Sequence, residues 1–195
     1  MKDIYLSEQA FLGMILSAAE VYNRECYGLL FGYSLPGKTI VEGAIAYQTA
    51  ERKFAEVSLY ERQNRVIQRV IAQFPKHEYV GEFHSHPHYG RRDGMAGLTE
   101  EDAIGVTEAE VQLVIAINPR RRTVCWSTNA DGTLSGTLAD YHFAFAGYHF
   151  LHPKRNGRKR KRGRSRRKVR SRLFRANVYC PYAVGLNPGG MANGR

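Results

Sequence analysis

The most restrictive feature of the chain is a run of basic residues between positions 154 and 172. This run holds thirteen lysine or arginine residues, no acidic residue and a single apolar residue, Val169. A segment of this composition cannot bury enough apolar surface to offset the conformational entropy lost on folding. We therefore expect the folded domain to occupy residues 1–153, and residues 154–195 to form a basic, largely disordered C-terminal extension.

The charges divide at the same place. The sequence of 195 residues has a net charge of +11, but all 18 acidic residues lie in residues 1–153. That part holds 14 basic residues, so its net charge is −4, and the other 15 basic residues follow it. An apolar content of 43% is typical of a globular chain. A mildly acidic domain is therefore joined to a strongly basic segment.

Helical and extended patterns alternate along the first part of the chain. Ser7 is predicted to cap a helix that ends near Tyr22, and a second helix is predicted between Ser58 and Phe74. Strands are predicted at 3–6, 27–33, 39–47, 111–117, 123–128, 133–138 and 141–151, the last being the final strand, with one more strand running into His84. Helices interleaved with such strands indicate an α/β fold.

The strand that enters His84 carries two histidines at its end. Side chains on a strand alternate between its faces, so His84 and His86 are expected to point the same way. Pro87 has no N–H to donate and should end the strand there. Two imidazoles on one face make up half of a metal site.

A carboxylate is needed as the third ligand, and Asp102 is the first candidate. Thr99 is predicted to cap a short helix with Asp102 in its first turn, an arrangement that also occurs as a simple capping box without any metal. The two roles are compatible. Asp93 is the second candidate, and His88 could take the place of a missing ligand. Two histidines, one carboxylate and an open fourth position form a hydrolytic zinc centre.

The order Glu25, His84-Ser85-His86-Pro87 and Thr99-x-x-Asp102 resembles the JAMM motif of the JAB/MPN metalloprotease family. The stretch 25–32, Glu-Cys-Tyr-Gly-Leu-Leu-Phe-Gly, is similar to a strand that carries the family's upstream glutamate. The resemblance covers roughly residues 1–150. Thr99 stands where the family usually has serine, and the loop between Pro87 and Thr99 is a few residues longer than usual.

The resemblance implies both a fold and an activity. The fold would be a mixed β-sheet flanked by helices, a sandwich like that of cytidine deaminase. One Zn²⁺ per chain would be bound by His84, His86 and Asp102, with Glu25 as general base and Thr99 assisting the oxyanion. The expected activity is that of a metallopeptidase or isopeptidase. Family members often cut at the C-terminal tail of a ubiquitin-like or sulfur-carrier protein.

Other functions stay open. The chain could be a catalytically silent MPN-type scaffold, tethered to nucleic acid or to acidic partners through residues 154–172, or a metal enzyme acting on a non-protein amide. The basic run is dense enough for non-specific binding of nucleic acid, for attracting an acidic protein, or for no selected role at all.

Cysteine usage and hydropathy bear on the compartment. The three cysteines, Cys26, Cys125 and Cys180, form no CxxC pair, which favours a reducing environment. No signal peptide and no apolar stretch of membrane-spanning length is visible in the sequence. We therefore expect a cytoplasmic protein without membrane contact.

Overall fold

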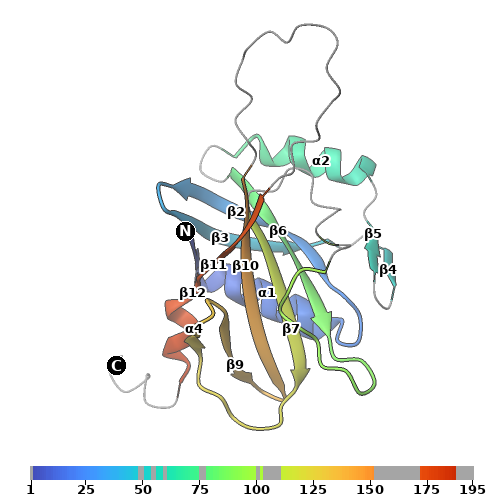
Figure 1. Cartoon of the computed structure of the whole chain (residues 1–195). Coiled ribbons are helices and arrows are strands. Elements are labelled where there is room, and N and C mark those ends of the chain that lie inside the picture. The colour runs from blue at the N-terminus through green and yellow to red at the C-terminus, as the bar shows by residue number, and fades with distance from the viewer. Residues whose placement is uncertain are drawn as a thin grey trace, which may run out of the picture.

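The computed structural model describes residues 2–47, 51–53, 56–58, 61–74, 78–99, 102, 111–151 and 172–187. In these ranges the helices are α1 (Glu8–Glu20), α2 (Glu61–Ile71) and α4 (Pro181–Gly185). The strands (Figure 1) are β1 (Asp3–Leu6), β2 (Tyr27–Leu35), β3 (Lys38–Ala46), β4 (Glu51–Lys53), β5 (Glu56–Ser58), β6 (Glu78–Pro87), β7 (Val111–Pro119), β8 (Ser127–Thr128), β9 (Leu134–Leu138), β10 (Tyr141–Leu151), β11 (Arg172–Ala176) and β12 (Val178–Tyr179).

Ten of these strands form one mixed sheet that nearly closes on itself. Their order is β12-β1-β3-β2-β6-β7-β10-β9-β8, and β11 also pairs with β10. Only Asn177 separates β11 from β12, so the chain that pairs with β10 at one side goes on to pair with β1 at the other. The prediction of an α/β fold with a mixed sheet is confirmed, whereas the near closure of that sheet was not predicted.

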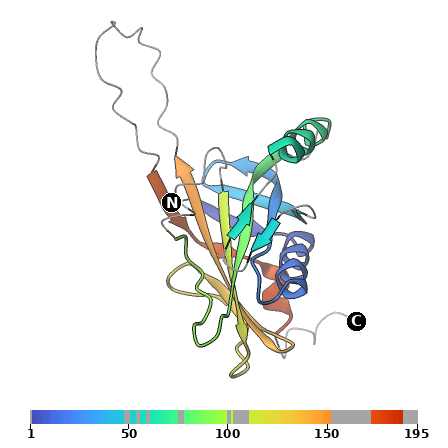
Figure 2. The same ribbon diagram turned by 90° about the vertical axis from the view of Figure 1, so that its right-hand side faces the viewer.

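Helix α1 packs against one face of the curved sheet (Figure 2) and buries one of its own sides there. The Ser7 side chain accepts a hydrogen bond from the Ala10 N–H and so caps the helix as predicted. Phe11 is fully buried, and its ring lies 5.0 Å from that of Trp126 and 5.8 Å from that of Phe145. The helix thus joins strands from both halves of the sheet into one hydrophobic core.

The C-terminal part of the chain belongs to this core. The sequence analysis named β10 as the final strand and placed everything after residue 153 in an extension, but residues 172–187 form β11, β12 and α4. Leu151 pairs directly with Arg172. The basic run is therefore a connection between two neighbouring strands, and the domain extends past it.

The remaining differences concern the ends of elements. Helix α2 begins at Glu61, whereas Ser58, from which the helix was predicted, lies in β5. In the predicted hairpin before β10, the first strand is shortened to Ser127–Thr128. No helix among the described residues is long and apolar enough to cross a membrane.

Replacing Val178 by alanine tests whether the C-terminal strand is part of the core. Val178 is 0% exposed, and its side chain lies beside Gly147 of β10. We expect Val178→Ala to lower the free energy of unfolding by about 2 kcal/mol, measured by urea denaturation. Val184→Ala is the matched control, because Val184 on α4 is 45% exposed and should change the stability by less than about 0.5 kcal/mol. Equal effects of the two substitutions would contradict this placement.

Candidate metal centre

Strand β6 buries the side chains on one of its faces and carries two histidines on the other. Phe83 and Ser85 are 0% exposed, and Phe83 belongs to the core around α1. The strand alternates, so His84 and His86 point away from that core, as predicted. Pro87 is the last residue of β6. His84 is only 8% exposed, which leaves its imidazole few contacts with water.

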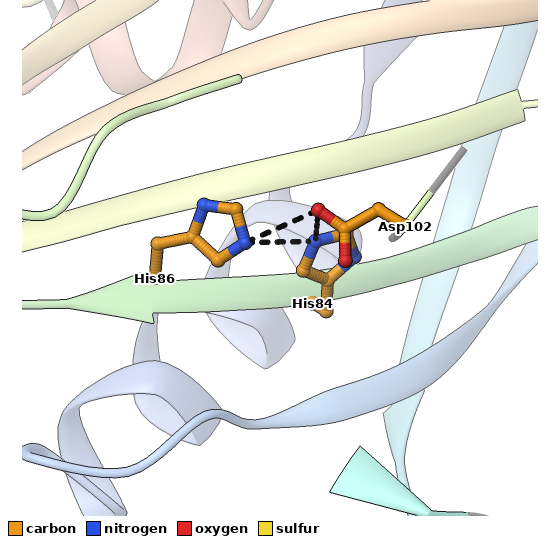
Figure 3. Close-up of side chains that lie close together, drawn as sticks. All are labelled: His84, His86 and Asp102. Carbon is orange, nitrogen blue, oxygen red and sulfur yellow. Dashed lines mark hydrogen bonds and ion pairs between the residues drawn. The ribbon is translucent and has the colours of Figure 1, made fainter. Parts of the chain in front are cut away.

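Asp102 completes a group of three side chains (Figure 3). The Oδ2 atom of Asp102 lies 3.5 Å from the Nε2 atom of His84 and 3.5 Å from the Nε2 atom of His86. The two Nε2 atoms are 3.2 Å apart. The structure therefore brings together the three residues that the sequence analysis named as metal ligands, in spite of the longer loop between them.

The three distances suit a metal ion better than direct hydrogen bonds. An N–H···O hydrogen bond normally spans about 2.7–3.2 Å, and a bond between charged groups is shorter still. A tetrahedral zinc site with bonds of about 2.0–2.1 Å separates its ligand atoms by about 3.3 Å. The observed separations of 3.2, 3.5 and 3.5 Å lie around that value. The triad can therefore hold a metal ion without rearrangement.

A reciprocal pair of hydrogen bonds fixes Asp102. The Thr99 N–H donates to Asp102 Oδ2 over 2.7 Å, and the Asp102 N–H donates to Thr99 Oγ1 over 3.1 Å. This is the predicted cap, while residues 100–101 and 103–110 lie outside the described residues. Burial disfavours the ionised carboxylate, but the imidazoles of His84 and His86 and the Thr99 N–H together hold the pKa of Asp102 well below its usual range.

The loop backbone determines which nitrogen of His86 is free. The Nδ1 atom of His86 lies 2.9 Å from the carbonyl oxygen of Met95. A carbonyl can only accept, so Nδ1 carries the hydrogen and Nε2 of the neutral ring keeps a lone pair. Burial lowers the pKa of His86, but Asp102, the Met95 carbonyl and Glu25 outweigh it and raise the pKa above its ordinary value.

Asn118 ties the loop to the sheet. Its side-chain amide accepts from the Gly94 N–H over 2.7 Å and donates to the Gly94 carbonyl over 3.0 Å. A Cβ atom on Gly94 would lie 2.0 Å from the His86 carbonyl oxygen, so only glycine fits there. The loop is thus held against β6, which fixes the Met95 carbonyl beside His86.

The alternative ligands of the sequence analysis lie outside the triad. His88 Nδ1 is 3.0 Å from Asp93 Oδ1, and His88 Nε2 is 2.9 Å from the Gly90 carbonyl. Asp93 also accepts a hydrogen bond from Arg121 over 2.9 Å. These two residues therefore pair within the loop.

Glu25 stands beside the triad because of the register of two strands. Tyr27 on β2 pairs with His84, and Cys26 makes two hydrogen bonds with Ser85. The Cys26 N–H donates to Ser85 Oγ over 2.8 Å, and the Ser85 N–H donates to the Cys26 carbonyl over 3.0 Å. Continuing this register places Glu25 opposite His86, and residues opposite one another share a face of the sheet. The effect of Glu25 on the pKa of His86 agrees with that position.

Two supporting groups were missed by the sequence analysis. The Met95 carbonyl is a backbone atom, so no residue type marks it in the sequence. Asn118 had a weak signal, since it is a polar residue directly after the apolar run of β7.

Comparisons with known proteins do not assign the chain to a family. No family model matches the sequence, and no curated protein matches it. Among solved structures, the chain is similar to the solution structure of protein DSY2949 from Desulfitobacterium hafniense, with 21% sequence identity and a TM-score of 0.46. The match covers 57% of this chain and 73% of that one. A function therefore has to be argued from the residues of the chain itself.

Replacing Gly94 by alanine should weaken metal binding without touching a ligand. The added methyl group pushes the loop off the His86 backbone and removes the Met95 carbonyl from His86 Nδ1. Loss of such a supporting contact typically lowers metal affinity about 10–100-fold. The measurement is a competition titration with Zn²⁺. Gly97→Ala is the control, because the nearest atom to its added Cβ is 3.8 Å away. Equal affinities in the two variants would show that the loop does not support the site.

Proposed function

We propose that this chain is a zinc-dependent hydrolase that cleaves peptide or isopeptide bonds, a metallopeptidase of the JAMM type. The observation that carries the proposal is the convergence of His84, His86 and Asp102 at the separations of tetrahedral ligands. The position of Glu25 next to His86 supports it. The order of these residues in the sequence, which resembles the JAMM motif, supports it as well.

The set of donor atoms is that of a catalytic zinc site. Three protein ligands, two imidazoles and one carboxylate, leave a fourth position for water or substrate. Zinc in such a site brings the pKa of its bound water to about 7 and polarises a carbonyl group. Its ligands must be deprotonated, which the lowered pKa of Asp102 favours. The contact with Met95 leaves Nε2 of the neutral His86 ring as the ligand atom, whereas the raised pKa of His86 means that metal binding weakens as the pH falls.

Glu25 would transfer the proton during the reaction, and Thr99 would stabilise the negative charge on the oxyanion. The Glu25 carboxylate accepts a proton as water adds to the carbonyl carbon of the substrate, and gives it to the amine when the C–N bond breaks. Thr99 Oγ1 accepts from the Asp102 N–H, so its own hydroxyl hydrogen is available to donate to the oxyanion.

The arrangement of elements is compatible with a JAB/MPN-like domain. Helix α1 precedes Glu25, which lies just before β2; β2 and β3 form a hairpin, and β6 lies beside β2 in the sheet. The resemblance also bears on the substrate. The bond that is cleaved would lie at the C-terminal tail of a ubiquitin-like or sulfur-carrier protein.

Zinc content after reconstitution is the first test. We expect one zinc per chain in the wild type and in Glu25→Gln, and loss of zinc in His86→Ala, measured by elemental analysis. His88→Ala is the matched control, because His88 pairs with Asp93 and should leave the zinc in place.

Hydrolysis of peptide and isopeptide substrates then separates an enzyme from a metal-binding scaffold. Glu25→Gln should lower the rate about 10²–10⁴-fold with its zinc retained, because a general base contributes about that factor. A wild-type protein that binds no zinc would contradict the proposal. Zinc binding with equal activity in the wild type and in Glu25→Gln would remove Glu25 from the mechanism.

A second candidate function is binding of nucleic acid or of an acidic partner through residues 154–172. Its support is the density of positive charge, thirteen lysine or arginine residues within 154–172. The two ends of this stretch are held together, because Leu151 pairs with Arg172 in the sheet. His86 pairs with Ala116 of β7, and Ala116 pairs in turn with Ala144 of β10. His86 and Ala144 therefore lie at the same height along the strands. Leu151 lies seven residues farther along, roughly 23 Å away. A tethering surface there would not block the triad.

Salt dependence tests this second function. Binding of a fluorescent oligonucleotide should weaken steeply as salt rises, because neutralising phosphates releases counterions. Replacing the lysines and arginines of 154–170 with serine should flatten that dependence. The matched control is Arg91→Gln with Arg92→Gln, on the loop beside the metal centre. An unchanged slope in the serine variant would contradict the function.

A further inference from the structure

A hollow of about 200 Å³ opens where β7 ends and β10 begins. Its lining includes Asn118 and Pro119 at the end of β7, Arg121 and Arg122 just after it, and His142 at the start of β10. Asp93 of the loop completes one side. The proposed mechanism uses none of these side chains.

The hollow lies on the same face of the sheet as the triad. His86 pairs with Ala116 on β7, and Asn118 is two residues farther along that strand. Residues two apart share a face and are roughly 7 Å apart. His142 pairs with Asn118 from the other side. Along the strand direction the hollow is therefore about 7 Å beyond His86, and across the sheet it lies one to two strands away.

The charges in the hollow leave one cation without a partner. Arg121 is paired with Asp93 at 2.9 Å, and His88 contacts the same carboxylate. Arg122 has no carboxylate partner in the described part of the chain. Burial lowers the pKa of His142 and the nearby charge of Arg122 lowers it further, and together they outweigh the opposite effect of Asp93. An entering anion would meet the Arg122 guanidinium and the His142 imidazole together.

We propose that this hollow binds a carboxylate of the polypeptide substrate, held by Arg122 and His142. His142 is offset from His86 by roughly 7 Å along the strands and by two strand spacings of about 4.8 Å across the sheet, which gives roughly 12 Å. An extended chain advances about 3.3–3.5 Å per residue, so the carboxylate would lie about three or four residues from the bond that is cleaved. A guanidinium offers paired N–H donors that match a carboxylate. The group can be an acidic side chain or the terminal carboxylate of the chain. This inference rests on the proposed peptidase function.

Peptide binding to the zinc-loaded Glu25→Gln protein tests the inference without cleavage. The probes are the acetylated, amidated peptides Gly-Gly-Gly-Glu-Gly and Gly-Gly-Gly-Gln-Gly, and their affinities are measured by isothermal titration. We expect the glutamate peptide to bind about tenfold more tightly, because one charge-assisted contact is worth about that factor. Adding Arg122→Gln should abolish the preference. Arg91→Gln should keep it, since Arg91 is an exposed loop arginine that does not line the hollow.

A third probe identifies the source of the carboxylate. Acetyl-Gly-Gly-Gly with a free C-terminus is compared with its amide. A preference for the free acid that disappears in Arg122→Gln also supports the inference and assigns the hollow to the end of the substrate chain.

Several outcomes would overturn the inference. Equal binding of the acidic and neutral peptides in every pair is one, and a preference that survives in Arg122→Gln is another. A third is an oligonucleotide that displaces the glutamate peptide and itself depends on Arg122, since the hollow would then be a phosphate site. Failure of the proposed function shows separately, as missing zinc in the same samples.

Discussion

The alternation of side chains along β6 decides on which face of the sheet the candidate metal centre lies. Phe83 and Ser85 are buried on the inner face of the sheet, so His84 and His86 have to take the other face. A slip of one residue in the pairing of β6 would bury both imidazoles in the core and expose a phenylalanine. The hydrogen bonds between Cys26 and Ser85 fix the register where the histidines emerge.

The triad is assembled by local interactions that need no metal ion. Thr99 holds Asp102 through a cap, and the Asn118 amide holds the loop whose carbonyl orients His86. The three ligand atoms therefore have almost the spacing of a tetrahedral site before an ion binds. Little of the binding energy would be spent on ordering the ligands, which favours tight binding.

Local patterns in the sequence predicted those parts of the site that are set by local structure. The spacing of His84 and His86 before a proline, and the Thr99–Asp102 cap, follow from strand and helix geometry over a few residues. The support from Met95 could not be predicted, because it is a backbone carbonyl on an irregular loop. The near closure of the sheet was missed because β11 and β12 are short and follow a basic run that indicates disorder.

The pairing of β1 with β12 has a consequence for the synthesis of the protein. The Ile4 N–H donates to the Asn177 carbonyl, and the Asn177 side chain donates to Asp3, which is 174 positions away in the chain. The first strand must wait for this partner until residue 178 has left the ribosome. Contacts of such high contact order form slowly, and α1 keeps apolar surface exposed meanwhile. The sheet can therefore be completed only late in synthesis.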